Sequence, residues 1–443
     1  MRLFALRDYR RLFSAQIVAL FGTGLTTVAL GLLAYELAGP RAATVLGTAL
    51  TIKMVLYVVI APLAAAYVDR LPRRAFLASL DVVRALVVLA LPLVTEVWQV
   101  YVLIGVLQSA SAAFTPTFQA VIPDIVTDEA AYSRALSASQ VASTMESLLS
   151  PVLAAVALSF VGFDLLFLGT SVGFALSTAL VLSTRVPDAR PSVHAKAWDK
   201  AAAGIRTFLA TPRLRGVMAL NLVVAAAGSI VVVNTVNHVR DTLGGTRSDV
   251  AWMLAASGGG TLLAALALPR VLDRVAARTV MTTGAGVLVG GTAGAVVLAA
   301  AGLTSGAASW TGTAAVWGLI GVGMALVITP TGKVIRGAVP ANRVPEAFAA
   351  QFSLSHLAWL VTYPVAGWLG TDPGLTVAWS VLAGLAAIGA TASLLLWPKG
   401  ATGPKGTRGV EGTKGAEGTG VPSAVRKDLS ASPASTTETT LAA

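Results

Sequence analysis

Long runs of apolar residues alternate along the chain with short turns that contain glycine, proline or charged residues, such as AGPR and GTDPG. A membrane-spanning helix needs roughly 20 apolar residues to cross about 30 Å of hydrocarbon. The pattern predicts twelve such helices, at residues 13–38, 42–67, 75–94, 97–119, 134–160, 163–184, 216–239, 249–268, 279–301, 308–329, 345–369 and 375–397.

The overall composition supports this interpretation. Of the 443 residues, 55% are hydrophobic and only 12% are charged, with a mean hydropathy of +0.76. Soluble domains carry about 25% charged residues. The chain therefore has too little polar surface to face water on all sides, and we expect an all-α integral membrane protein. The absence of cysteine excludes disulfides and thiolate metal sites.

Lysine and arginine are distributed unevenly between alternate loops. One set of loops holds only Arg41, Arg240 and Arg247, whereas the termini and the other loops hold most of the 32 basic residues. The positive-inside rule then places both termini in the cytoplasm of a multi-pass protein of the inner (cytoplasmic) membrane. Because topology explains the net charge of +11, we expect a lipid bilayer and no nucleic acid as partner.

A long polar loop at residues 185–215 divides the chain into two six-helix bundles, residues 1–184 and 216–397. Within the loop, DKAAAGIRTFLA is typical of an amphipathic helix lying on the inner membrane surface, with Ile205, Phe208 and Leu209 on one face.

The tail, residues 398–443, is rich in Gly, Thr, Ser and Pro, with glycine at every third position from Gly403 to Gly418. This composition favours a disordered cytoplasmic segment over a collagen-like triple helix.

Short motifs recur between the two halves at spacings of 204 to 214 residues. The pairs are DRLPRR at 69–74 with DRVAAR at 273–278, TPT at 115–117 with TPT at 329–331, and SPVLAA at 150–155 with YPVAGW at 363–368. Parallel repeats imply a pseudo-two-fold axis along the membrane normal, as in transporters whose halves rock about a central site. A channel or a membrane enzyme would not need this symmetry.

Residues 4–397 resemble the major facilitator superfamily. YVDRLPRR matches its signature loop between the second and third helices, with Ala65 in place of a glycine. The segments LRDYRRLFSAQIVALFGTGLTTVAL, DVVRAL and FTPTFQAVIPDIV resemble an efflux branch that includes siderophore exporters and macrolide efflux proteins. The resemblance implies two pseudo-symmetric bundles that alternate by a rocker switch. It also implies a cytoplasmic gate in which Asp69 contacts the start of the eleventh helix and the arginines form a charge network: Asp69, Arg70, Arg73, Arg74, Asp273, Arg274 and Arg278.

Two departures distinguish the chain from drug/proton antiporters of this superfamily. The fourth predicted helix has no charge where those proteins often carry an arginine. In the fifth, ESLLSPVLAA replaces a glycine-rich pattern, so that Glu146, Ser150, Ala154 and Ala155 stand where glycines are common. The mechanism of proton coupling therefore stays open.

Ionisable side chains within the predicted spans are the main candidates for function, because each costs about 2.5–3.5 kcal/mol at a helix centre. Glu146 lies on a polar face with Ser139, Ser143 and Ser150, and either binds a proton or cationic substrate or forms a fixed ion pair. Lys53 either pairs with Glu146 or contacts an anionic substrate. His356 either carries a proton or is a neutral, hydrogen-bonded histidine.

Other polar residues receive more modest assignments. Asp81 and Arg84 lie three residues apart on one helix, and we expect a structural pair. Glu36 is interpreted as a boundary residue. Because the first, fourth, seventh and tenth helices line the cavity in the superfamily, the resemblance implies cavity-lining roles for Gln16, Thr23, Thr27, Gln108, Ser111, Asn234, Asn237 and Trp317. The alternative for each Ser or Thr is a hydrogen bond to its own helix.

These observations predict a monomeric, proton-driven secondary transporter that exports a small amphipathic organic compound. No nucleotide-binding loop or clustered catalytic groups occur, so we expect neither an enzyme nor a cofactor, and the three histidines suggest no metal site. The alternatives are an uncoupled facilitator or importer, and a non-transporting membrane sensor or scaffold.

Overall fold

The computed structural model describes residues 3–67, 71–126, 128–185, 197–302, 306–340 and 343–397. All of them belong to one compact unit, Met1–Pro404. The predicted tail and two of the predicted gate residues, Asp69 and Arg70, lie outside the described residues.

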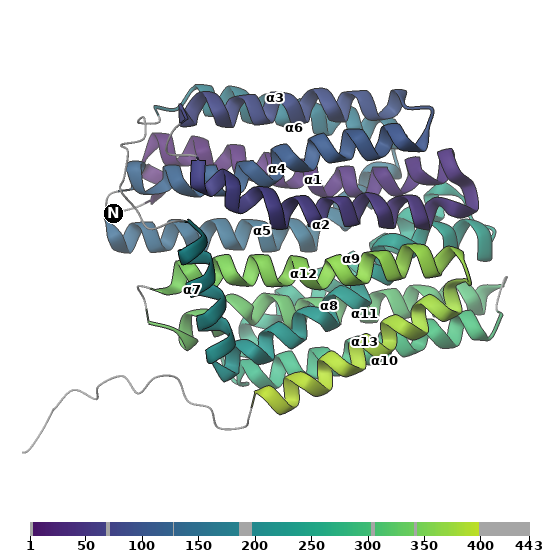
Figure 1. Cartoon of the computed structure of the whole chain (residues 1–443). Helices are drawn as coiled ribbons and strands as arrows, with labels where there is room; N and C mark the ends of the chain where they lie inside the picture. Colours follow the sequence, from purple (N-terminus) through teal and green to yellow (C-terminus); the bar gives the residue numbers. More distant parts are fainter. Residues whose placement is uncertain are drawn as a thin grey trace, which may run out of the picture. The chain divides into compact units, whose positions relative to one another are not determined.

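The described residues fold almost entirely into α-helices (Figure 1). The first half contains α1 (Arg7–Ala38), α2 (Ala42–Tyr67), α3 (Arg73–Ala90), α4 (Val97–Ile125), α5 (Glu129–Leu158) and α6 (Phe163–Leu182). A shorter helix, α7 (Ala197–Ala210), follows. The second half contains α8 (Pro212–Asn237), α9 (Arg247–Leu272), α10 (Ala277–Ala300), α11 (Ala307–Ala338), α12 (Val344–Thr371) and α13 (Leu375–Leu396).

The length and composition of these helices suit a membrane. Among the described residues, nine segments are long and apolar enough to cross one, and the first, Arg7–Ala61, covers both α1 and most of α2. The predicted fold class, an all-α membrane protein of paired six-helix bundles, is confirmed.

Several helices are longer than the apolar segments predicted them to be. Helix α1 begins at Arg7 rather than at residue 13, α4 continues to Ile125 rather than to residue 119, and α11 continues to Ala338 rather than to residue 329. Hydropathy detects only the part of a helix that matches the hydrocarbon layer. The additional turns carry polar residues, yet apolar side chains such as Tyr9 are buried there in a separate small core.

Each half packs mainly within itself. In the first half α1 lies against α5 and α6, and α3 against α4 and α6; in the second half α11 lies against α9 and α10, and α8 against α12 and α13. The two halves meet chiefly along α2 with α12 and along α5 with α9. The helices approach closely at Gly47 and Gly367, where a Cβ on Gly47 would lie 2.8 Å from the Cα of Gly367. Small residues permit such close helix contacts in membranes.

The helix ends form two faces, named here after one residue each. The Glu36 face is where α1 ends and α2 begins, and the Arg73 face is where α3 begins. On the Arg73 face, Arg74 donates to the carbonyl of Leu182 at the end of α6. The repeat-related Arg278 donates to the carbonyl of Trp397 at the end of α13, over 2.7 Å. An arginine at the same position of the repeat therefore caps the last helix of each half.

Helix α7 forms within the central loop, but its apolar face is covered by protein. Phe208 is fully buried in a cluster with Ile335 of α11 and Ala347 of α12, and Ile205 packs against this cluster, whereas Leu209 is exposed. Gly204 lies so close to α12 that a Cβ there would be 2.6 Å from the carbonyl of Glu346. The face predicted to contact the membrane therefore docks largely on the second bundle.

Candidate functional site

Three ionisable side chains from three helices lie near one another where the two halves meet. Lys53 is near the middle of α2, Glu146 of α5 and His356 of α12. Lys53 interacts electrostatically with both Glu146 and His356. Each of the three residues keeps part of its surface exposed, although all three lie deep among the helices. We call these three side chains the central cluster.

Aromatic rings from both halves form one wall of this cluster. The ring of Tyr57, one turn below Lys53 on α2, stacks on His356 with centroids 5.1 Å apart and planes 10° apart. The ring centroid of Phe352 lies 5.9 Å from that of Tyr57 and 4.1 Å from that of His356. Nδ1 of His356 is 2.6 Å from the carbonyl oxygen of Phe352. Because a carbonyl only accepts, Nδ1 carries the proton, and a neutral ring has its lone pair on Nε2.

The Lys53 ammonium has few direct partners. It lies 5.8 Å from the centre of the Tyr57 ring, a weak cation–π contact. Among the described residues, no carboxylate oxygen lies within 4.0 Å of it, so Lys53 and Glu146 interact without forming a contact ion pair.

Glu146 projects from α5 towards α1. Its Oε1 accepts a hydrogen bond of 3.3 Å from Ser150. A Cβ on Gly24 of α1 would lie 2.6 Å from the same oxygen, so the glycine is what allows the carboxylate to sit there. Farther along the same face of α5, Ser139 donates to Oε1 of Gln16 on α1 over 3.0 Å. The polar stripe on α5 therefore faces α1.

The remaining predicted cavity residues make contacts within the protein. Thr23 and Thr27 donate to carbonyls of their own helix, at 3.0 and 3.1 Å. Gln108 and Ser111 are buried; Ser111 interacts with the Tyr57 hydroxyl, and Oε1 of Gln108 has no hydrogen-bond partner among the described residues. Polar atoms left in this state favour a nearby water or ligand group.

In the second half, the predicted residues Asn234 and Trp317 belong to a buried aromatic network. The Trp317 indole N–H donates to Thr235 over 2.7 Å, and the Trp379 indole N–H donates to Asn234 over 3.1 Å. The ring centroid of His238 lies 5.6 Å from that of Trp317 and 5.2 Å from that of Trp379. Trp317 and Asn234 are fully buried, so in this conformation they do not border an open space.

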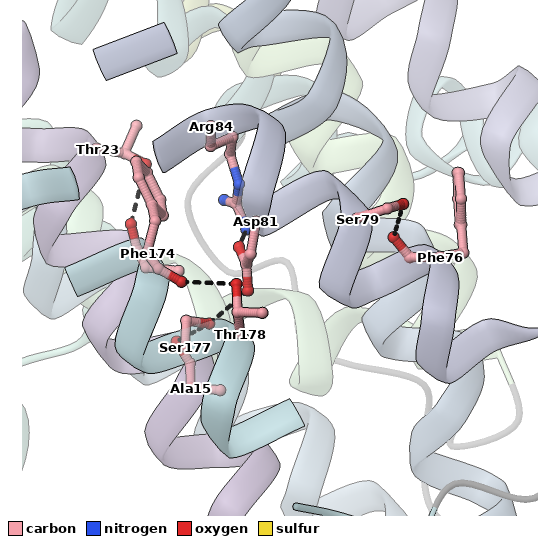
Figure 2. A network of polar contacts seen from close by, with 10 residues as sticks. Ala15, Thr23, Phe76, Ser79, Asp81, Arg84, Phe174, Ser177 and Thr178 are labelled. Atoms are coloured by element: carbon pink, nitrogen blue, oxygen red, sulfur yellow. Dashed lines mark hydrogen bonds and ion pairs between the residues drawn. The ribbon is translucent and has the colours of Figure 1, made fainter. Parts of the chain in front are cut away.

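Asp81 and Arg84 form a buried ion pair on α3 (Figure 2). Ser177 of α6 donates to the second carboxylate oxygen of Asp81 over 2.6 Å. The Arg84 guanidinium lies between the rings of Phe114 and Phe174, 4.2 and 4.5 Å from their centres. These contacts hold α3, α4 and α6 together.

The predicted gate residues on the Arg73 face are only partly described. Arg73 pairs with Asp124 at the end of α4, and Arg74 and Arg278 make the capping contacts given above. Asp273 and Arg274 are exposed. These contacts of the arginines tie together helices of the same half, and the predicted contact of Asp69 with α12 lies outside the described residues.

Sequence reasoning missed a set of contacts between the halves on the Glu36 face. Glu36 forms an ion pair with Arg247 at the start of α9, and Tyr35 donates to Asp241. Asn237, predicted to line the cavity, donates to the carbonyl of Pro40 over 2.9 Å. Opposite charges at helix ends on the same predicted side were the available signal.

Nearby, α2 is tied to α12 on the same face. Thr44 donates to Thr371 over 2.7 Å, and the Trp368 indole donates to Thr48 over 3.0 Å. Within the described ranges, no three His, Asp or Glu side chains gather as metal ligands.

Comparison with known proteins gives the following matches. A family model described as Major Facilitator Superfamily matches residues 12–236 and again residues 217–437. No curated protein matches the sequence.

Several solved structures are similar to the chain. A bacterial homologue of the human lysosomal transporter Spinster, in an inward-facing conformation, has a TM-score of 0.63 at 13% identity, covering 88% of this chain and 98% of its own. The nucleoside transporter NupG gives 0.62 at 13% identity, covering 88% and 100%. A POT family transporter in complex with a thioalcohol-conjugated peptide gives 0.65 at 12% identity, covering 87% and 94%. Identities this low show the fold alone.

Proposed function

The chain belongs to the Major Facilitator Superfamily and is a multi-pass membrane transporter, and from this premise we propose that it exports a small amphipathic organic compound in exchange for protons. In this proposal the two bundles rock about the central cluster, so that it opens to each side of the membrane in turn.

The observation that carries the proposal is the placement of Glu146 and Lys53. Both lie deep within the membrane-spanning part of the molecule, at the junction of the halves, and no contact ion pair ties them together. Ionisable groups are expensive at this depth, and they mark substrate or proton pathways. The charged Glu146 carboxylate can take up a proton and become neutral, and in its charged form it can bind a cation instead.

The charge distribution supports an orientation for the transporter. The Arg73 face carries the basic loops, and by the positive-inside rule it is the cytoplasmic face. The contacts of Glu36, Thr44 and Thr48 with the second half then close the outer side. On this assignment the cluster is sealed from the outside, and export requires these contacts to break.

The test is an efflux screen of amphipathic compounds in a bacterial strain that lacks its own pumps. We expect the wild-type chain to lower accumulation of a substrate, and a protonophore to abolish this effect. Glu146→Gln should remove the proton-dependent efflux with normal expression, because an amide does not ionise and so cannot take up and release the coupled proton. Asp164→Asn is the matched control, since this exposed acid begins α6 on the Glu36 face.

Other outcomes would redirect the assignment. Full efflux by Glu146→Gln would remove Glu146 from coupling. Flux that a protonophore leaves unchanged would favour an uncoupled facilitator or importer. Loss of function on deletion of residues 401–443 with these helices intact would favour a sensor or scaffold.

A further inference from the structure

The central cluster also points to a class of substrate. Building on the proposed transport function, we propose that it binds a small zwitterion with a planar apolar part. The substrate's anionic group meets Lys53, its cationic group meets Glu146, and its planar part packs against the rings of Tyr57, His356 and Phe352.

The charges of Lys53 and Glu146 are spaced as an open pair. Lys53 and Glu146 are close enough to interact, yet no carboxylate oxygen of the described residues lies within 4.0 Å of the ammonium. A pair serving only to neutralise itself would close to contact, because each desolvated charge gains most from a direct hydrogen bond. The open pair leaves both charges available to a ligand.

Lys53 and Glu146 both keep hydrogen-bonding positions that no described residue fills. An ammonium has three donors, and Lys53 makes no hydrogen bond to a described residue. The Glu146 carboxylate accepts one hydrogen bond from the described residues, that from Ser150. Gly24 holds α1 against this side of the carboxylate. One anionic and one cationic ligand group can fill the remaining positions.

The net charge of the site favours a zwitterion. Lys53 and Glu146 together are neutral, and His356 donates from Nδ1 to a backbone carbonyl. A zwitterion keeps the occupied site neutral. A ligand with a single charge leaves an uncompensated charge away from water, which is costly in a medium of low dielectric constant. The site therefore discriminates against singly charged analogues.

The aromatic wall supplies the apolar contact. Tyr57 and His356 stack nearly parallel, and Phe352 adjoins both. The hydrogen bond between His356 and the Phe352 carbonyl fixes the orientation of the imidazole. Planar ligands pack well against such fixed rings. Since Tyr57 belongs to the first half and His356 to the second, a ligand on this wall contacts both moving parts.

The experiment compares three probes with the same benzyl side chain on the purified full-length chain in lipid nanodiscs. Phenylalanine carries both charges, phenylalaninamide carries only the positive charge, and N-acetylphenylalanine only the negative charge. Binding is measured by titration calorimetry and by the shift of the thermal unfolding midpoint. We expect phenylalanine to bind at least tenfold more tightly than either analogue.

The variants then test which residue binds which charged group of the probe. Lys53→Met should weaken phenylalanine at least tenfold and make phenylalaninamide the preferred probe. Glu146→Gln should do the reverse and prefer N-acetylphenylalanine. A purely structural pair would not give this exchange of preference. Lys333→Met, which removes an exposed lysine on α11, is the control and should bind like the wild type.

Equal binding of the three probes by the wild type, no binding of phenylalanine, or the same preference in both variants would overturn the zwitterion assignment. Proton-driven efflux of a compound would still stand in that case, because it is measured independently of the probes. Conversely, charge-selective binding without any efflux would refute the proposed function and leave the binding site intact.

Discussion

The two halves of the transporter share helix caps and close helix contacts but differ in the side chains at matched positions. Arg74 and Arg278 cap the last helix of their own half in the same way. Gly24 on α1 and Gly228 on α8 are related by the same spacing, and each faces side chains of the repeat-related helix, α5 or α12. Opposite Gly24 stand the Ser150 hydroxyl and the Glu146 carboxylate, whereas opposite Gly228 stands the Trp359 indole.

The difference extends to other matched positions. Asp81 and Arg84 form a buried ion pair in the first half, and the positions related by the same spacing, Ala285 and Leu288, are buried and apolar. Lys53 corresponds to the buried Ser257 in α9. A repeat thus preserves small residues and end caps, which fix helix distances, while one copy concentrates the charges. We infer that the first half carries the ion and charge recognition and the second half mainly an aromatic counterpart.

The largest expected effect comes from making the first half resemble the second at one position. Arg84→Leu copies Leu288 but leaves Asp81 fully buried, with Ser177 as its remaining side-chain partner. Removing one member of a buried pair costs about 3–5 kcal/mol. We expect the free energy of unfolding to fall by this amount, measured by denaturant unfolding of the purified protein in detergent.

The double change Asp81→Ala with Arg84→Leu is the matched control, because it copies both Ala285 and Leu288. Replacement of a whole buried pair by apolar residues is often neutral. The double variant should therefore recover most of the lost stability. A double variant as unstable as Arg84→Leu would mean that the cation–π contacts with Phe114 and Phe174, and not the charge balance, hold this site together.

The helices could be predicted from the sequence because the apolar segments match the membrane thickness. Side-chain partners could not be predicted in the same way. Asn234 and Trp317 lie on helices expected to line a cavity, but the direction a residue faces depends on the rotation of its helix against its neighbours. Both are buried within the second half, where Thr235 and Trp379 satisfy them. Hydropathy gives no information on that rotation.

The pairing of Glu36 with Arg247 was missed for a related reason. The sequence places both at helix ends on one side of the membrane, but not which ends are adjacent. That information comes from the packing of the two halves against each other. The nearness of Lys53 to Glu146 was an expectation from family resemblance, since their separation along the chain indicates nothing.

The second prediction uses the two matched glycines. Gly24→Ala and Gly228→Ala each add a Cβ where neighbouring atoms already stand, Glu146 with Ser150 in one case and the Trp359 ring in the other. Overpacking of this kind costs about 1–3 kcal/mol. We expect similar losses of unfolding free energy, because both glycines lie at close helix contacts. Proton-driven efflux should fall strongly only in Gly24→Ala, which displaces the carboxylate.

Measuring unfolding free energy and proton-driven efflux in both variants separates effects on helix packing from effects on transport. If Gly228→Ala reduced efflux as much as Gly24→Ala at equal stability, the aromatic counterpart would take as direct a part in transport as the acidic one. The functional division between the halves would then be wrong, although the structural repeat would remain.

The smallest effect is expected where the halves are most alike. Arg74→Gln and Arg278→Gln each remove a hydrogen bond to a carbonyl in the last turn of α6 or α13. A single hydrogen bond contributes about 0.5–1.5 kcal/mol. The two losses of unfolding free energy should be equal within about 0.5 kcal/mol and should add in the double variant, because distant sites are independent. Arg10→Gln, at an exposed position of α1, controls for the loss of charge. A much larger loss for Arg74 than for Arg278 would show that the first copy of the motif does more than cap a helix, and the neighbouring ion pair of Arg73 with Asp124, which Ala277 cannot reproduce, would then be the difference to test.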